Sequence, residues 1–219
     1  MAEMVNSFNR LITLTNRTLR KDKKNEWVVI HYVGAVSSAE ANAKYFYKEY
    51  RGASANYFVD EKSIWQVVED KDDAWHVGAK KYYNACRNNN SIGIELCCKN
   101  NGQWYFENET IDNAVWLTAM LMKKYNIPMS RLTTHYLTTH KRCPEPFVRD
   151  PKQWENFRER VAKLLVEEIK TEQEALDYLV EKERITNKEY WEKALQVVKN
   201  LNFLIIKWAN DVKALETEK

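Results

Sequence analysis

Long hydrophobic runs are missing from this sequence. No stretch has the roughly 20 apolar residues that a membrane-spanning helix needs, and residues 1–24 lack the apolar centre of a signal peptide. We therefore expect that the protein does not insert into a membrane and that it is synthesised in the cytoplasm. If it acts outside the cell, a separate agent must release it.

Excess charge and disulfide-forming cysteines are missing too. The formal net charge is only +3, which does not favour a nucleic-acid partner, although it would weakly attract an anionic polymer. The four cysteines (Cys86, Cys97, Cys98 and Cys143) have no spacing typical of disulfides, so reduced thiols are expected.

The chain does contain enough apolar material for a core. Hydrophobic residues make up 44% of its 219 residues, which fits one domain with an appendage. Eight tryptophans and twelve tyrosines are many for this length. Such side chains either pack in a core or stack on sugars, and composition alone leaves both uses open.

The segment from Thr134 to Pro144 gathers imidazole, thiol and amine groups within a few residues. Pro144 and Pro146 close it, which predicts a loop rather than a helix. A loop of this kind can direct His135 and Cys143 at one ion, and an imidazole with a thiolate suits zinc. A catalytic zinc takes three protein ligands and leaves one position for water, so we expect a third ligand elsewhere.

Two strand patterns contain a polar residue that needs an explanation. His31 ends the apolar run 28–30, where a strand would hold it rigidly as the third zinc ligand. Taken alone, His31 also fits a hydrogen-bonded core histidine. Glu95 lies within the alternating strand 91–97, where a carboxylate is costly to bury unless it is paired or functional.

Strand and helix patterns alternate up to about residue 168, which predicts an α/β fold. Strands are predicted at 28–30, 57–59, 63–68, 91–97 and 131–134. Helices are predicted at 38–50, at 110–125 and from 151 onward, and residues 6–20 also show apolar residues at loosely helical spacing.

The composition changes after residue 168, and residues 169–219 read as a separate helical hairpin module. Thr171 with Glu174 and Thr186 with Glu189 form capping-box patterns. A heptad seam follows, formed by Trp191, Ala194, Val198, Leu201, Ile205, Trp208, Val212 and Leu215. The hairpin could cover the main domain, bind a cell wall, or associate with a second copy of itself, and the pattern leaves these uses open.

Four motifs occur in a fixed order: His31, then WHVG at 75–78, SIGIE at 91–95, and KRCP at 141–144 after His135. In that order they resemble the zinc-dependent N-acetylmuramoyl-L-alanine amidases of the type-2 family, which includes peptidoglycan recognition proteins and phage lysis amidases. The resemblance covers residues 26–165. It implies a central mixed β-sheet flanked by helices, with Zn²⁺ at the floor of a groove.

The resemblance also assigns roles to individual residues. It implies zinc ligands at His31, His135 and Cys143, and catalytic residues at Glu95 and Lys141.

Substrate contact is expected from three further residues. His76 matches a segment that lies near the substrate in the family. Many relatives carry Tyr or His where this chain has Asn56, and Tyr57 is its neighbour. Adjacent strand residues point to opposite faces, so which of Asn56 and Tyr57 reaches the substrate stays open.

The resemblance implies a peptidoglycan hydrolase that cleaves the amide bond between N-acetylmuramic acid and L-alanine with zinc-activated water. We expect a phage or prophage endolysin that lyses its host. The alternatives are a bacterial autolysin, a wall-recycling amidase and a non-catalytic peptidoglycan-binding protein. Cys143 favours an enzyme, because binding-only relatives commonly lose that ligand. A closed structural zinc site would need His140 as its fourth ligand, and His140 matches the family pattern less well than His135.

Overall fold

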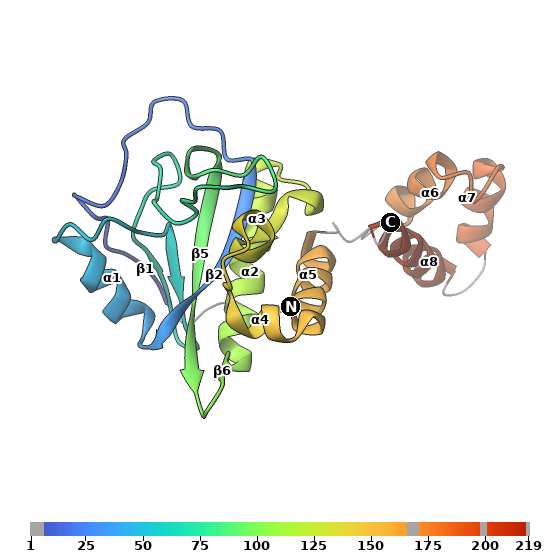
Figure 1. The fold of residues 1–219 in the computed structure, drawn as a ribbon. Coiled ribbons are helices and arrows are strands. Elements are labelled where there is room, and N and C mark those ends of the chain that lie inside the picture. Colours follow the sequence, from blue (N-terminus) through green and yellow to red (C-terminus); the bar gives the residue numbers. More distant parts are fainter. Residues whose placement is uncertain (1–6, 166–170, 198–200, 218–219) are drawn as a thin grey trace. The chain divides into compact units, whose positions relative to one another are not determined.

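A mixed β-sheet forms the centre of the first part of the chain in the computed structural model, which describes residues 7–165, 171–197 and 201–217. The strand order is β1-β4-β3-β5-β2-β7, and β6 pairs with β5 outside this path (Figure 1). The strands are β1 (Phe8–Arg10), β2 (Trp27–Val36), β3 (Tyr57–Val59), β4 (Ile64–Gln66), β5 (Ser91–Asn100), β6 (Trp104–Tyr105) and β7 (Leu132–Thr134).

The two long central strands are β2 and β5, which run parallel to each other. Their apolar runs, including Ile30 and Ile94, are fully buried, as expected of parallel strands that are covered on both faces. Strands β3 and β7 extend the parallel part on either side, whereas β3 pairs with β4 and β5 pairs with β6 in antiparallel fashion. The predicted mixed sheet is therefore confirmed.

Helices cover both faces of this sheet. They are α1 (Ala39–Tyr47), α2 (Asn108–Tyr125), α3 (His135–Thr139), α4 (Glu145–Arg149) and α5 (Pro151–Leu165). Ala39 and Ala43 of α1 pack with Phe58 and Cys97 on one face. On the other face, α2 lies behind the strands, and its residue Tyr125 donates a hydrogen bond to Asp70, which also accepts one from Tyr57 of β3. All four cysteines are free, as expected, and all four are buried.

The helical spacing seen at residues 6–20 does not produce a helix among the described residues. Phe8–Arg10 instead forms the edge strand β1 beside β4, and the amides of Leu11 and Thr13 continue the ladder to the carbonyls of Gln66 and Val67. The open edge of β4 offers hydrogen-bond partners to these backbone groups. In a short helix the same groups would have to pair within the helix itself, which is marginally stable at this length. The prediction from spacing was wrong because this pairing outweighs a weak local preference.

The loop predicted between Thr134 and Pro144 is also partly helical. The Thr134 side chain accepts a hydrogen bond from the Leu137 amide and so caps α3, and His140 ends that helix in a left-handed conformation with φ 62°. The prolines follow this helix and therefore do not interrupt it. Pro146 lies in the first turn of α4, where a missing N–H group is tolerated.

The chain divides into two compact units, Met1–Val161 and Ala162–Lys219. The second unit contains α6 (Glu172–Glu181), α7 (Lys188–Val197) and α8 (Leu201–Thr217). Helices α6 and α8, with Ile185, form a core of Ala175, Leu176, Leu179, Ile185, Ile205, Ala209 and Val212. Trp191 and Leu195 of α7 pack against this core. A self-contained core of this kind is what an independently folding module requires.

The helical prediction for the second unit is confirmed, with two differences in detail. The heptad seam is divided between α7 and α8, so three helices are described where the hairpin implied two. The capping box of Thr171 and Glu174 is present, but Asn187 rather than Thr186 accepts the Tyr190 amide at the start of α7. The predicted boundary at 168/169 and Val198 of the seam lie outside the described residues.

None of the described helices is long and apolar enough to cross a bilayer.

Candidate metal centre

The sheet places His31 and Glu95 side by side. His31 of β2 and Glu95 of β5 are direct partners in the parallel ladder, and Phe58 of β3 is the next partner of Glu95 in the same row. Paired residues in one row of a sheet project from the same face. The imidazole, the carboxyl group and the Phe58 ring therefore share one face, which is the face that α1 covers.

Strand β7 and helix α3 bring the other two candidate ligands to the same place. Thr134, the last residue of β7, pairs with Ile30 of β2, so His135 follows directly beside His31. The Tyr136 amide donates a hydrogen bond to the Cys143 carbonyl, which folds the segment after α3 back onto its start. Residues 104 positions apart in sequence are thereby fixed as neighbours.

The three side chains converge closely. His31 Nδ1 lies 3.1 Å from His135 Nδ1 and 3.7 Å from Cys143 Sγ. One donor atom from each residue lies within 4.8 Å of the others, and all three residues are buried. Tetrahedral zinc, with bonds of about 2.05 Å to nitrogen and about 2.3 Å to sulfur, separates two nitrogens by about 3.3 Å and a nitrogen from a sulfur by about 3.6 Å. The donor set and its spacing therefore fit a zinc ion.

Burial controls the protonation of these donors. Burial, and then the charge of Lys141, lower the pKa of His135 to about 4. Burial, and then His76, His135 and Lys141, hold the pKa of His31 well below 6.5. Both imidazoles are therefore neutral and able to bind a cation at neutral pH. Burial, and then the nearby Glu95, raises the pKa of the Cys143 thiol, so this ligand must lose a proton when it binds a metal.

Glu95 is the acidic group of the site. Its Oε2 atom is buried and has no hydrogen-bond partner among the described residues. Burial raises the pKa of its carboxyl group to about 8, although the positive charge of Lys141 acts in the opposite direction. A carboxyl group with such a pKa can both accept and return a proton near neutral pH.

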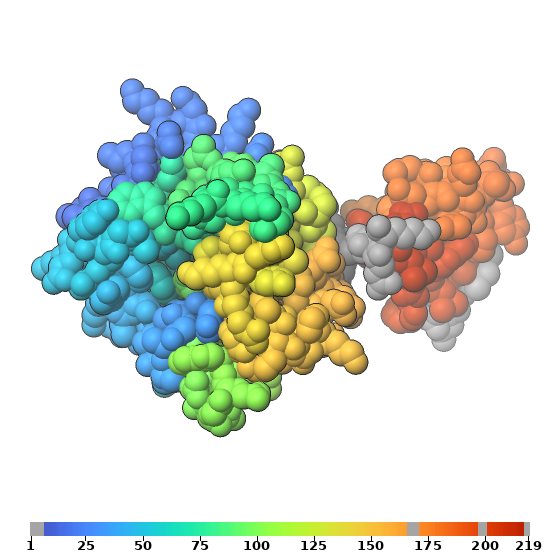
Figure 2. All heavy atoms as spheres, viewed as in Figure 1, coloured from blue at the N-terminus to red at the C-terminus, as the bar shows by residue number. Residues whose placement is uncertain are grey.

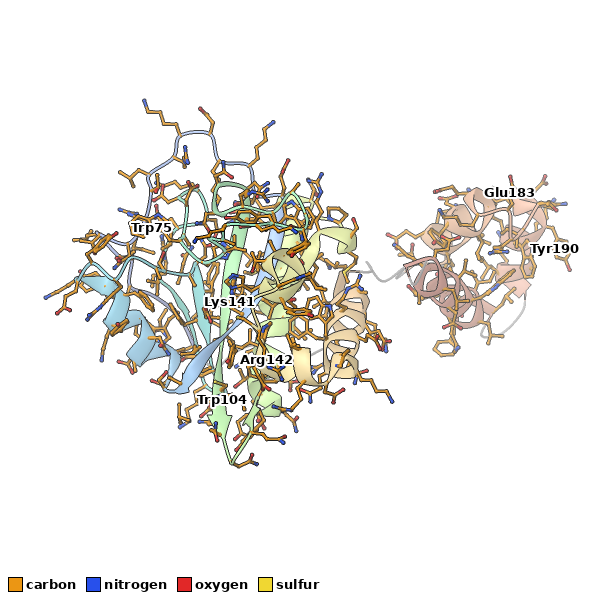
Figure 3. The ribbon with its side chains drawn as sticks, viewed as in Figure 1. Trp75, Trp104, Lys141, Arg142, Glu183 and Tyr190 are labelled. Atoms are coloured by element: carbon orange, nitrogen blue, oxygen red, sulfur yellow. The ribbon has the colours of Figure 1, made fainter. Side chains whose placement is uncertain are left out.

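A cavity of about 310 Å³ opens over the three candidate ligands, and Glu95, His76, Lys141, Arg142 and Trp75 also line it. Figure 3 labels Trp75, Lys141 and Arg142. A second cavity of about 460 Å³ runs along α1 and shares the Glu95 wall with the first. The donor set therefore lies in an open groove and not in a closed core.

The structure brings together most of the predicted site residues, but not all of them. Asn56 is fully buried, and its side chain joins the Gly93 amide to the carbonyls of residues 68 and 69. Tyr57 points to the opposite face and donates to Asp70. Neither residue lines the groove, so this geometry gives no support to substrate contact by either of them. His76 does border the cavity, but its ring nitrogens face His31 and Ser91.

His140 is not part of the donor set. Its ring is exposed and stacks on Tyr83 at a centroid distance of 3.6 Å. The backbone of this segment is tied to the loop that carries Tyr83, whose amide donates to the Thr138 carbonyl, and the two segments lie side by side in the space-filling view (Figure 2). The structural-zinc alternative therefore lacks its fourth ligand.

Arg142 was overlooked in the sequence. It borders the cavity and forms a 3.2 Å ion pair with Glu145. Its position between Lys141 and Cys143 was the available signal. Ser91 was overlooked as well, because a serine at the start of a strand has no distinctive pattern.

The fold and the donor set together define an α/β domain with three convergent side chains that fit a metal ion at the floor of a groove. Residues 21–146 match the family described as N-acetylmuramoyl-L-alanine amidase. The chain belongs to this family.

Individual relatives agree with this assignment. A probable N-acetylmuramoyl-L-alanine amidase of Bacillus licheniformis is 30% identical over 175 residues, which is 75% of this chain and 49% of the relative. The amidase CwlH of Bacillus subtilis is 33% identical over 121 residues, which is 55% of this chain and 45% of the relative. The chain thus spans about half the length of the curated relatives it matches.

Solved structures show the same fold. A mutant endolysin from Bacillus subtilis is similar with a TM-score of 0.61 and 26% identity, covering 72% of this chain and 99% of the other. The structure of PlyL has a TM-score of 0.62 and 23% identity, covering 71% of this chain and 96% of the other.

Proposed function

We propose that this protein is a zinc-dependent hydrolase that cleaves the amide bond between N-acetylmuramic acid and L-alanine in peptidoglycan. The observation that carries the proposal is the convergence of His31, His135 and Cys143 at the floor of a groove that also contains Glu95 and Lys141. Family membership supplies the substrate class.

His31, His135 and Cys143 would hold the ion. When bound, zinc acidifies a water molecule and polarises a carbonyl oxygen. The two neutral imidazoles and one thiolate leave a single net charge of +1 on the occupied site. The groove leaves a side of the site accessible, as a catalytic metal requires and a structural one does not.

Glu95 would move the proton. Its unpartnered Oε2 atom is free to accept a proton from the attacking water and to pass it to the nitrogen of the leaving L-alanine. Burial raises the pKa of this carboxyl group in the metal-free protein, which favours the return of that proton to the leaving group. Phe58, its neighbour in the sheet row, lines the same cavity and gives this group an apolar neighbour.

Lys141 would stabilise the negative charge that develops on the substrate carbonyl oxygen. It lies two residues after the end of α3 and borders the cavity, and its backbone amide donates a hydrogen bond to the Thr139 hydroxyl. A cation aimed at a developing oxyanion is worth about 2.7–4 kcal/mol of barrier. Arg142, also on the rim, would bind a carboxylate of the peptide stem.

The decisive experiment is the release of new N-terminal L-alanine from purified peptidoglycan with and without a zinc chelator. Chelator-sensitive release without new reducing sugar ends is expected. New reducing ends would identify a glycosidase instead, and pelleting with walls without any release would identify a binding protein.

We further propose that the protein acts as an endolysin, with the second unit serving as a wall-binding or self-association module. Two features support this role: the likeness to a structure described as an endolysin, and the exposed apolar side chains of α7 and α8. Tyr190, Phe203 and Leu204 are 62%, 66% and 57% exposed, which leaves apolar surface available for a partner. Figure 3 labels Tyr190. The alternative is a bacterial autolysin or an amidase that recycles wall fragments. Two measurements would separate these roles: lysis of cells by protein added from outside, and cleavage of soluble muropeptides.

A further inference from the structure

Behind the candidate ligand His31 lies a chain of buried polar groups that leads away from the groove. His31 Nε2 is 2.9 Å from His76 Nδ1, and His76 Nε2 is 3.1 Å from the Ser91 hydroxyl. The Ser91 hydroxyl in turn donates to the carbonyl oxygen of Arg87. His31, His76 and Ser91 are all buried, so solvent does not offer them alternative partners.

The direction of every bond in this chain follows from its last member. A backbone carbonyl can only accept, so the Ser91 hydroxyl must donate to Arg87. The Ser91 oxygen then accepts from His76 Nε2, which makes Nε2 the protonated nitrogen of His76. His76 Nδ1 is therefore an acceptor, and it must receive its hydrogen from His31 Nε2.

One nitrogen of His31 remains, and it is the one that faces the other ligands. With its proton on Nε2, His31 presents a lone pair at Nδ1. Nδ1 is also the atom that lies 3.1 Å from His135 and 3.7 Å from Cys143. Two separate observations, the hydrogen-bond chain on one side and the donor set on the other, thus select the same nitrogen.

The surrounding backbone holds His76 in this position. The Asn88 side chain accepts hydrogen bonds from the amides of His76 and Val77, which fixes the loop that carries the ring. The ring lies so close to β5 that a Cβ atom on Gly93 would come within 2.6 Å of it. Only glycine at position 93 leaves room for the imidazole. This close approach is a physical reason for the glycine in the middle of a buried strand.

We infer that His76 is a positioning residue for the metal site. Ser91 and Asn88 hold His76 through hydrogen bonds, and Gly93 leaves room for its ring. His76 fixes the tautomer and the ring plane of His31, so that Nδ1 is always ready to bind zinc. His135 has no such support, because its Nε2 atom has no partner among the described residues. The inference rests on the proposed function and adds a role that substrate contact alone would not give His76.

Zinc affinity tests this inference without reference to turnover. The dissociation constant of the zinc-loaded protein would be measured by competition with a chromogenic chelator for the wild type, His76→Phe, His76→Asn and Ser91→Ala. Phenylalanine keeps the ring volume but accepts no hydrogen bond, whereas the asparagine oxygen can take the place of Nδ1. His140→Phe is the matched control, because His140 is a nearby histidine outside the donor set.

We expect His76→Phe to weaken zinc binding about 10–100-fold, the usual effect of losing a partner behind a metal ligand. His76→Asn should recover most of that loss, Ser91→Ala should show a smaller loss, and His140→Phe should match the wild type. In ¹⁵N NMR spectra of the zinc-loaded wild type, His31 should carry its proton on Nε2. Its proton signal should move upfield in His76→Phe.

A second arm uses the contact with Gly93. Gly93→Ala should weaken zinc binding by displacing the His76 ring, and adding His76→Ala should cause little further loss, since the two changes disturb the same contact. Wild-type affinity in His76→Phe, or equal losses in His76→Phe and His76→Asn, would overturn the inference. A wild-type chain that bound no zinc would instead defeat the proposed function.

Discussion

His31 and Glu95 are direct partners in the ladder between β2 and β5, so a candidate metal ligand and a carboxyl group leave the same face of the sheet from adjacent strands. The pairing sets their separation by backbone hydrogen bonds, which are among the most rigid elements of a fold. Mobile loops therefore do not have to bring the proposed proton-transfer group to the candidate metal site.

Replacing a ligand should remove the metal. His31→Ala is expected to lower zinc affinity by more than about 100-fold, because even partners behind the ligands are worth 10–100-fold. Zinc content after dialysis, measured by elemental analysis, checks this, with His140→Ala as a control that keeps its metal. A stoichiometric zinc content in His31→Ala would remove this residue from the ligand set.

Lys141→Ala should separate chemistry from metal binding. The variant is expected to retain zinc and to lose about 10²–10³ in kcat, since one group that stabilises an oxyanion is lost. Release of L-alanine termini from peptidoglycan measures the rate. Lys152→Ala, an exposed lysine on α5, provides the control, and full activity of Lys141→Ala would refute the assigned role.

Zinc binding should release a proton from Cys143. The neutral histidines have none to give, whereas burial holds the thiol protonated at neutral pH. Apparent affinity should therefore fall about tenfold for each unit of pH below the thiol pKa. Calorimetric titration in two buffers of different ionisation enthalpy counts the protons. The Cys143→Asp variant should release fewer protons when it binds zinc, because the Asp carboxyl group ionises more readily than the thiol. Equal proton release by the wild type and this variant would show that the thiol is not the source of the protons.

Glu95 should make the metal-free protein less stable as the pH rises. Its carboxyl has a pKa of about 8 in the fold against 4.5 when unperturbed. Below pH 4.5 both states are protonated and Glu95 has no effect. Between pH 4.5 and 8 the unfolded chain loses its proton while the folded chain keeps it, so stability declines over that interval and then levels off.

The comparison with Glu95→Gln isolates this effect from the histidines. At pH 8 the free energy of unfolding of the metal-free variant should exceed that of the wild type by a few kcal/mol. This order of magnitude follows from ~1.4 kcal/mol per pKa unit. At pH 4 the two proteins should have the same free energy of unfolding. Denaturant unfolding at several pH values measures the difference. A difference independent of pH would mean that burial does not raise this pKa.

Removal of the second unit should separate cleavage from attachment. A chain ending at Glu168 is expected to cleave soluble muropeptides at the wild-type rate, because the described groove is built from the first unit. Its binding to intact walls, measured by pelleting, or its self-association, measured by sedimentation, should fall. If wall binding and self-association were both unchanged, the second unit would have neither of the two proposed binding roles.

Much of the site was predictable because its residues occupy strand ends and motifs with a strong chemical signature. His31 follows a fully apolar run, and Cys143 precedes a proline, so both could be located from the sequence. The strand containing Glu95 was also predicted correctly, because alternating apolar and polar residues are a strong strand pattern.

The remaining features depend on contacts that a linear pattern does not contain. Phe8–Arg10 became a strand because the open edge of β4 lies beside it. His76 was expected at the substrate, but its position behind His31 depends on Asn88 and on a missing side chain at Gly93. Neither relationship has a sequence spacing by which it could be recognised.

The close approach of His76 to Gly93 also limits how this site can be moved or redesigned. A designer who transferred only His31, His135 and Cys143 to another scaffold would carry over the donors without the strand glycine and the loop that fix the orientation of His31. A transferred site therefore needs strands β2 and β5, the loop from His76 to Ser91 that orients His31, and the segment from β7 to Cys143 that carries the other two donors.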